Sequence, residues 1–152
     1  VVVPAEESGT GSDLTISQAD LDSLMRSKAA MYTILETITE SVGITPFELT
    51  SFYVAGTFGS FINPESAISI GMLPDLPRDR YKSLGNSSLG GAALALESDS
   101  YHDKINQIRE RITYLELNVN QDFMNRFSAA KFLPHTNPSL FPSVKTVQKI
   151  GI

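Results

Sequence analysis

The clearest pattern in the chain is a helical one near its start. Apolar residues recur every three or four positions over residues 21–42, and Lys28 is the one charged residue in that stripe. This spacing places the stripe on one face of a helix. Ser17 and Asp20 resemble a capping box at its beginning, and Gly43 supplies a stop. The pattern predicts a helix over residues 17–42.

Shorter apolar runs predict strands between further helices. Residues 52–55 form an apolar run without polar alternation, which is typical of a strand buried on both faces. Residues 81–84 and 113–117 predict two more strands. Helix-start signals stand at Thr45 (for a single turn), at Asn63, at Ser87 or Ser88, near Ser100 and at Asn120. Helices interleaved with short strands predict an α/β class, with helices packed on a small sheet.

The two ends of the chain differ from its middle. Residues 1–13 are rich in Pro, Glu, Ser and Gly and predict a flexible linker. Residues 14–133 carry the helix and strand signals, and residues 134–152 contain three prolines and predict an irregular tail. The chain does not begin with Met. We therefore expect a piece of a longer protein.

Composition excludes several classes of function. The 152 residues suffice for one domain, and the net charge of −5 argues against binding to nucleic acid or to an anionic membrane. The absence of cysteine excludes disulfides, Cys-ligated metal clusters and a thiolate nucleophile. Two histidines are too few for a His-built metal centre. No signal peptide or membrane-spanning run is visible, so we expect a cytoplasmic protein.

Three features are candidates for chemistry. Glycines in residues 56–59 follow the predicted strand, where they form either a ligand-facing turn or a tight structural turn. Lys28 either snorkels to water or points its ammonium at a carboxylate or a ligand phosphate. Small residues at 90–93 indicate close packing of a helix or a contact helix beside a hinge. No catalytic constellation is present.

Taken in order, several segments resemble one family. They are residues 17–21, 28–30, 54–62, 67–74, 85–92 and 114–117, then Phe123, Phe127 and residues 132–134. This order is similar to the C-terminal part of the reductive activators of corrinoid proteins. Those proteins are ATP-dependent iron–sulfur proteins that return an inactive cob(II)amide to the cob(I)amide state in methyl-transfer systems.

The resemblance implies one half of an actin-like, ribonuclease H-like ATPase fold, shared by acetate and sugar kinases, heat-shock chaperones and actin. It implies that this half supplies the adenosine side of a nucleotide site, while Thr57 stands where the family usually has a second glycine. The nucleotide-facing residues would be Gly56, Thr57, Phe58, Gly59, Ser60, Ser23, Ser27 and Lys28. The connecting helix to the other half would contain Asn86, Gly90, Gly91 and Ala92.

The resemblance also implies cofactors and partners. ATP and Mg²⁺ would be gripped by motifs of the parent protein that this chain lacks, and the iron–sulfur cluster would lie in the parent only. The partners would be a corrinoid protein of a methyl-transfer system, the missing N-terminal domains, and a second copy in a homodimer. The alternative is a non-catalytic module for dimerisation or corrinoid-protein docking. Aromatic residues near the end motivate it, namely Tyr114, Phe123, Phe127, Phe132 and Phe141.

Overall fold

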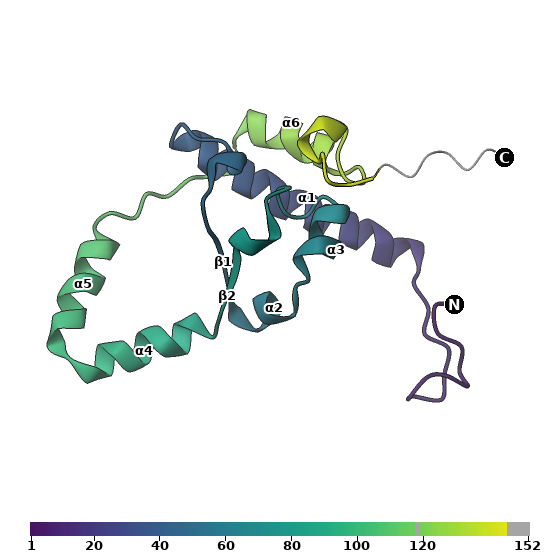
Figure 1. Ribbon diagram of the computed structural model, residues 1–152, viewed down its shortest axis with the longest axis horizontal. Coiled ribbons are helices and arrows are strands. Elements are labelled where there is room, and N and C mark those ends of the chain that lie inside the picture. The colour runs from purple at the N-terminus through teal and green to yellow at the C-terminus, as the bar shows by residue number, and fades with distance from the viewer. Residues whose placement is uncertain (118, 146–152) are drawn as a thin grey trace.

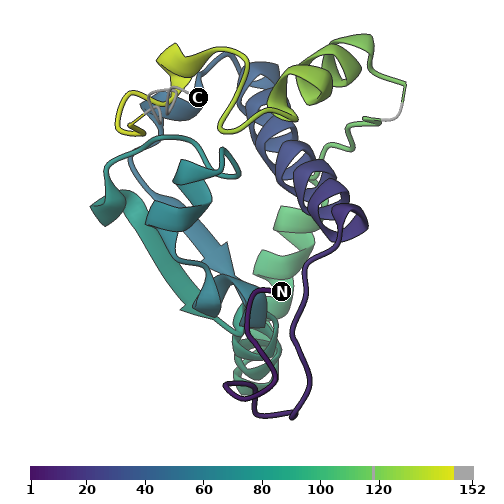
Figure 2. The same cartoon turned by 90° about the vertical axis from the view of Figure 1, so that its right-hand side faces the viewer.

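A long first helix organises the molecule. The computed structural model describes residues 1–117 and 119–145. Helix α1 (Gln18–Ser41) lies between the sheet and α6 (Gln121–Ala130) in both views (Figure 1, Figure 2). Arg126 of α6 forms ion pairs with Glu40, at 2.5 Å, and with Glu36, at 3.6 Å. These pairs fasten the two helices to each other.

The sheet consists of two parallel strands, β1 (Phe52–Ala55) and β2 (Tyr81–Gly85). Their connection contains α2 (Gly56–Phe61), α3 (Pro64–Ser69) and the 3-10 turn η2 (Arg78–Arg80). The remaining elements are the turn η1 (Pro46–Glu48), α4 (Ser87–Glu97), α5 (Asp99–Arg109) and the turn η3 (Pro138–Leu140). Helices packed on a small parallel sheet confirm the predicted α/β class.

Two strand predictions are wrong. Tyr53 of β1 is 62% exposed, so β1 is not buried on both faces. A two-stranded sheet has no second layer to cover its outer face, which explains the difference. Residues 112–117 belong to no strand. A β-prone run becomes a strand only where a neighbouring strand takes up its hydrogen bonds, and this segment finds none among the described residues.

Polar caps begin the helices. Ser17 Oγ accepts the Asp20 N–H at 3.2 Å, and Asp20 Oδ2 accepts the Ser17 N–H at 2.8 Å, which completes the predicted capping box. Asn63 and Asn120 cap α3 and α6, as predicted. The cap of α4 is Asn86, whose Oδ1 accepts the Leu89 N–H, and neither Ser87 nor Ser88. Asn is as good a helix cap as Ser, so the sequence alone could not decide which of the three adjacent polar residues caps α4.

The core joins elements that are distant in the sequence. Tyr32 of α1 and Phe141 are both almost fully buried, and their ring centroids lie 5.4 Å apart. The other core residues come from α1, α3 and the turn after it, and α6: Ala29, Ala67, Ile68, Leu73 and Ala130. The C-terminal segment up to Val144 therefore packs on the core, while residues 146–152 of the expected tail lie outside the described residues. At the other end, Val3 and Leu14 form an isolated antiparallel bridge.

Helices α4 and α5 project from the end of β2 as an arm (Figure 1). Neither helix contains a buried residue, and their main contact is with each other. A Cβ added at Gly90 or Gly91 would meet no atom within 4 Å. Close packing of residues 90–93 is therefore not realised within the described part of the chain. In this same part, no helix is both long and apolar enough to cross a membrane.

Candidate functional site

The glycine segment forms the junction between β1 and α2. Gly56 has φ +86°, a left-handed conformation that favours glycine, and it begins α2 directly after the strand. A Cβ at Gly59 would lie 2.6 Å from Val54 Cγ1, so the bare Cα lets α2 turn back onto β1. The segment is thus a strand-to-helix junction in which residues 57–60 are helical. The backbone conformation explains the glycine at position 56, and the close approach to Val54 explains the glycine at position 59.

An apolar crevice of about 350 Å³ opens between α1 and this junction. Its walls include Met31, Ile34 and Leu35 of α1, all of β1, Gly59, and Ile62. Ser27 and Ser23 stand one and two helical turns before Met31, so they continue the same face of α1. Both serines are exposed. The fold therefore places Gly59 across the crevice from Met31, Ile34 and Leu35, while both serines lie on that face of α1 outside the crevice lining.

A second crevice of about 170 Å³ adjoins the first and shares Val54, Gly59 and Ile62 with it. Its polar lining includes Ser60, Lys82 and Ser83. Sequence reasoning missed Lys82 and Ser83, because only the parallel register that pairs Val54 with Ser83 brings β2 to α2. Nothing in the residue pattern of 81–85 indicates that register.

The chemistry of the first crevice suits a flat, weakly polar group. The first has almost no polar lining, and residues 49–64 contain no charged side chain. A purine ring and its ribose match such walls, whereas three phosphates and Mg²⁺ require cations and carboxylates. Among the described residues, no three His, Cys, Asp or Glu side chains gather as metal ligands. The first crevice is therefore an apolar site rather than a site for charged groups.

Lys28 faces another direction. Its side chain is fully buried, and Nζ donates hydrogen bonds to the carbonyl oxygens of Phe132 and of Pro134, the latter at 2.7 Å. Burial lowers the pKa of this ammonium to about 8. These contacts contradict both interpretations of Lys28 made from the sequence. The ammonium does not reach water, and it does not point at a carboxylate or a ligand phosphate. The apolar stripe in the sequence could not indicate that main-chain carbonyl groups of residues 132–134 accept hydrogen bonds from this lysine.

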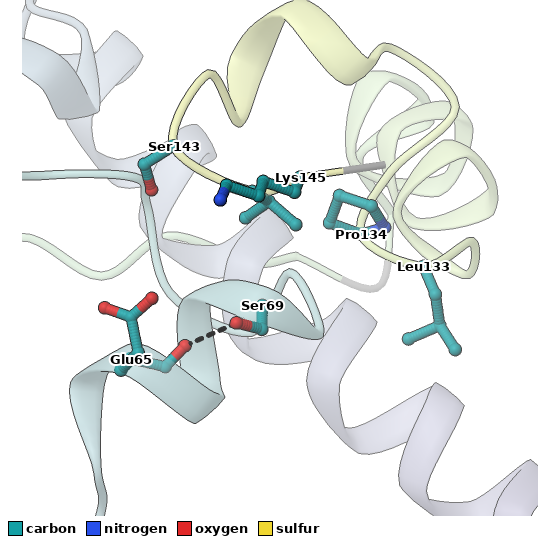
Figure 3. Close-up of a pocket in the computed structure, with 7 residues that line it drawn as sticks. Glu65, Ser69, Leu133, Pro134, Ser143 and Lys145 are labelled. Atoms are coloured by element: carbon teal, nitrogen blue, oxygen red, sulfur yellow. Dashed lines mark hydrogen bonds between the residues drawn. The ribbon is translucent and has the colours of Figure 1, made fainter. Parts of the chain in front are cut away.

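A larger cavity, about 590 Å³, lies elsewhere, between α3 and the C-terminal segment (Figure 3). The Ser69 hydroxyl donates to the Glu65 carbonyl oxygen at 2.8 Å within α3. The Ser143 hydroxyl, which also lines the cavity, donates a hydrogen bond to Asp75 Oδ1 at 2.6 Å and so takes part in a network that joins two segments of the chain. The cavity lining from the C-terminal segment is Leu133, Pro134, Ser143, Val144 and Lys145. It is a seam between two packed segments.

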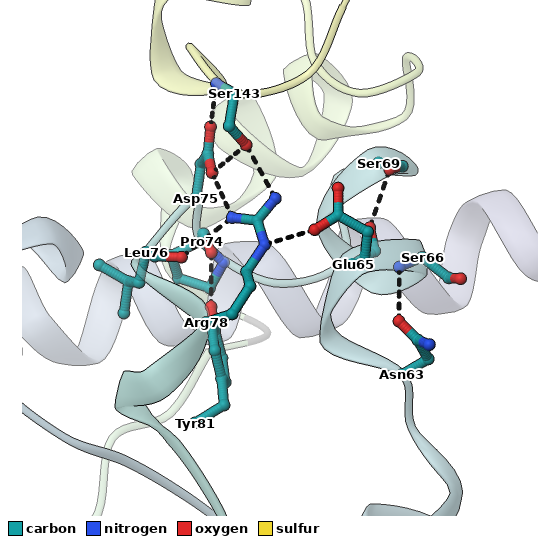
Figure 4. Close-up of polar contacts among 10 residues, drawn as sticks. All are labelled: Asn63, Glu65, Ser66, Ser69, Pro74, Asp75, Leu76, Arg78, Tyr81 and Ser143. Carbon is teal, nitrogen blue, oxygen red and sulfur yellow. Dashed lines mark hydrogen bonds and ion pairs between the residues drawn. The ribbon is translucent and has the colours of Figure 1, made fainter.

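A polar network closes that seam beside α3 (Figure 4). Arg78 bonds Glu65 Oε2 at 2.6 Å and Asp75 Oδ1 at 2.9 Å, and its third nitrogen donates to Ser143 Oγ at 2.9 Å. The Ser143 N–H also donates to Asp75 Oδ2, at 2.6 Å. Burial by itself would raise the pKa of Asp75, but the hydrogen bonds from Ser143 and Arg78 hold that pKa below its usual value. The network anchors the C-terminal segment.

Replacing Asp75 by alanine is expected to lower the free energy of unfolding by about 2 kcal/mol, because two donors on Ser143 and one on Arg78 lose a buried acceptor. Chemical denaturation would measure the loss. Glu65→Ala is the matched control, since Glu65 bonds the same guanidinium from a side chain that is 64% exposed. Its expected cost is below about 1 kcal/mol. Equal losses in both variants would contradict the anchoring role of Asp75.

The aromatic residues near the end of the chain divide into two groups. Phe123 and Phe127 stack on α6 with centroids 6.2 Å apart, and Phe141 belongs to the core. Tyr114 is 83% exposed and Phe132 is 59% exposed. Only two of the five aromatics are therefore free to meet a partner.

Comparison with known proteins yields one consistent set of relatives. A family model described as the C-terminal domain of RACo, the ASKHA domain, matches residues 1–145. The corrinoid activation enzyme RamQ of Eubacterium limosum is 32% identical over 126 residues, which cover 83% of this chain and 21% of RamQ. The solved structure of a reductive activator for corrinoid, iron-sulfur protein superposes with a TM-score of 0.84 at 40% identity, over 95% of this chain and 23% of that one. The chain spans about a fifth of the length of these relatives.

Proposed function

The chain belongs to the family of RACo C-terminal ASKHA domains, and we propose that it is the C-terminal part of an ATP-dependent reductive activator. In this proposal the whole protein reduces the cob(II)amide of a corrinoid protein to cob(I)amide. This part supplies the adenosine side of the nucleotide site. The observation that carries the proposal is the apolar crevice between α1 and the junction of β1 with α2.

The geometry of that crevice supports a nucleoside as its ligand. Gly59 removes a side chain from the wall formed by α2, and Met31, Ile34 and Leu35 offer an apolar surface from α1. The exposed hydroxyl groups of Ser27 and Ser23 lie further along the same helix face, where they can meet a ribose. The Thr57 methyl and hydroxyl groups stand at the start of α2. An adenine ring has the shape and polarity that these walls accept.

The remaining chemistry belongs to the rest of the activator. An iron–sulfur cluster does not fit this chain, which has no cysteine to ligate it. The phosphates and Mg²⁺ need charged side chains as binding partners, and residues 49–64 contain none. ATP would drive an uphill electron transfer only by binding two conformations of the protein with different affinity. A site divided between two halves provides such conformations, open and closed, and this chain forms one wall.

An NMR titration of this chain with adenosine, and separately with Mg·ATP, tests the proposal. We expect shifts at residues 56–60 and 23–31, with a dissociation constant of roughly 1 mM, about −4 kcal/mol. Adenosine and Mg·ATP should bind alike, because the phosphate ligands belong to the other half. Ser27→Ile should abolish the shifts, because it replaces a hydroxyl proposed to meet the ribose by a bulky apolar side chain on the same face of α1 as Met31. Arg26→Ile is the matched control, since Arg26 is exposed and points away from that face.

The outcome distinguishes the two functions under consideration. Shifts that are confined to residues 56–60 and 23–31 and lost in Ser27→Ile support the adenosine side. Absence of shifts in this chain and in the longer polypeptide would overturn it and favour a docking or dimerisation module. Shifts that survive Ser27→Ile unchanged would place the nucleoside elsewhere.

A further inference from the structure

We propose that His135 is a proton-sensitive fastener of the C-terminal segment, and that protonation of its ring releases residues 135–141 from α1. The neutral imidazole holds these residues in place, and the charged imidazole does not. The contacts of the ring and the charges around it carry this inference, which goes beyond the proposed function and does not depend on nucleotide binding.

The ring of His135 joins the C-terminal segment to α1. Its centroid lies 5.5 Å from that of Tyr32 and 6.3 Å from that of Phe141. The rings of Tyr32 and Phe141 are 5.4 Å apart, and both side chains are almost fully buried. The remaining buried members of that core are apolar. A half-buried imidazole therefore packs on two core aromatics, and a charge on it would lie against the core.

A main-chain hydrogen bond requires the neutral ring. The Asn137 N–H donates to His135 Nδ1 at 3.0 Å. An amide N–H can only donate, so Nδ1 must offer its lone pair, and the proton of the neutral ring then belongs to Nε2. In the protonated ring both nitrogens carry a proton, so this hydrogen bond is lost.

The same bond belongs to the turn that places Phe141 in the core. Asn137 caps η3, and its Oδ1 accepts the Ser139 N–H at 3.1 Å and the Ser139 hydroxyl at 2.7 Å. The Phe141 N–H in turn donates to the Pro138 carbonyl oxygen at 3.0 Å. Loss of the bond between His135 and Asn137 therefore frees the start of the turn that ends at Phe141.

The charges around the ring also oppose its protonation. Lys28 Nζ donates to the carbonyl oxygen of Pro134 at 2.7 Å, next to His135 in the chain. Burial and then the charge of Lys28 lower the pKa of His135 from 6.5. Tyr32, the other titratable group of α1 against the ring, is neutral, because burial and then the charge of Glu36 raise its pKa. Among the described residues no carboxylate pairs with the ring, so a protonated His135 would add an unpaired positive charge beside Lys28.

The release is local, because the far end of the segment is fastened by groups that stay charged. Ser143 is bonded to Asp75 and to Arg78. The pKa of Asp75 lies below its usual value and arginine is always charged, so both remain ionised at pH 5.5. In the open segment the pKa of His135 returns to about 6.5. The open form then takes up the proton first, so the ratio of open to closed segment rises as the pH falls below about 6.5, by at most about tenfold for each pH unit.

Hydrogen exchange and nitrogen NMR of this chain test the inference. We expect the His135 ring to carry its proton on Nε2 at pH 7.5 and to titrate below pH 6.5. The protection factors of the Asn137 and Phe141 amides, which correct for the intrinsic dependence of exchange on pH, should fall by about three- to tenfold between pH 7.5 and pH 5.5. Both amides should be less protected than the amide of Tyr32 at every pH, which marks the opening as local.

Two variants assign the effect to one ring. His135→Phe keeps an aromatic ring in the cluster but has neither a lone pair nor a proton to titrate. Its protection factors at Asn137 and Phe141 should be lower at pH 7.5 than those of the unchanged chain, and they should not change down to pH 5.5. His102→Phe is the matched control, because His102 lies on α5 with a side chain that is 58% exposed. This control should retain the full dependence on pH.

Three results would overturn the inference. The first is a ring that carries its proton on Nδ1 at pH 7.5 or titrates at pH 6.5 or above. The second is a set of protection factors that stays constant from pH 7.5 to pH 5.5 in the unchanged chain. The third is a dependence on pH that His135→Phe retains in full, since another group would then release the segment. If His135→Phe fails to fold, the ring titration and the exchange of the unchanged chain still decide.

Discussion

Replacing Gly71 by alanine is expected to lower the free energy of unfolding by about 3–5 kcal/mol, through backbone strain and overpacking together. Gly71 has φ +74°, and an added Cβ would overlap the Pro134 carbonyl oxygen and lie 2.7 Å from the carbonyl carbon. Main-chain atoms cannot swing aside as a side chain does. The variant must therefore push the segment around Pro134 away from α3, which disturbs the hydrogen bond from Lys28.

Gly43→Ala is a matched control for this loss. Gly43 ends α1 with φ +76°, and Gly71 follows the end of α3. In both places the glycine N–H and the next N–H bond back to carbonyls of the last helical turn, as in a Schellman motif. An added Cβ at Gly43 meets nothing within 4 Å. Its cost should be the strain alone, about 1–2 kcal/mol. Denaturant unfolding of both variants measures the difference, and equal losses would refute the contact with Pro134.

Local hydrogen bonds made much of the fold predictable. Ser17 with Asp20, Asn63 and Asn120 cap the helices whose starts they indicated, because donor and acceptor lie within three residues of each other. Glycines at helix ends behave in the same way. The apolar stripe of α1 was recognisable in the sequence because α1 packs against α6 and because Met31 and Leu35 pack on the core. Each of these signals depends on near neighbours in the sequence.

Features that depend on distant partners could not be predicted. Residues 113–117 have the composition of a strand, but no neighbour pairs with them in the described structure. Lys82 approaches Ser60 only through the register of the sheet. The role of Phe141 was equally hidden, since a proline-containing segment gives no periodicity that would mark a core residue.

The candidate site was recognised from the family resemblance more than from spacing. The order of segments identified the family, which the comparisons confirm. Spacing alone indicated a turn at 56–59, for which a structural reason suffices at each glycine. The proximity of this turn to α1 is a tertiary fact. Ser23 and Ser27 were named from the resemblance alone, because no spacing in the sequence links them to residues 56–60. Lys28, one residue further along, belongs to a different face.

Lys28 is unusual in being buried with carbonyl oxygens and no carboxylate for partners. Two acceptors, from Phe132 and Pro134, bind its Nζ. A neutral amine also has two N–H donors, so loss of the charge keeps both hydrogen bonds possible. Desolvation penalises the charged form alone, which is why the pKa falls to about 8. Protonation of Lys28 thus works against folding without being required for its contacts.

The stability of the chain is therefore expected to rise with pH from about 8 to about 10. In this window the folded state releases the Lys28 proton while the unfolded chain, with a lysine pKa near 10.5, still holds it. The unfolded state binds more protons, so the free energy of unfolding increases with pH, by up to about 3 kcal/mol. Burial, and then the charge of Glu36, raise the pKa of Tyr32 in the folded state. Above about pH 10 the tyrosine of the unfolded chain therefore ionises first, and the free energy of unfolding falls again.

Urea unfolding at pH 7, 8, 9 and 10 measures this profile, and Lys28→Met identifies its source. Methionine fills the same volume without a charge, so the rise should disappear in that variant. The exposed Lys131→Met should retain it. His135, which packs against Tyr32, does not interfere, because burial and then the charge of Lys28 lower its pKa from 6.5. If the free energy of unfolding still rises with pH in Lys28→Met, another group releases the proton. Lys28 would then stay protonated in the folded state, as a lysine in water does.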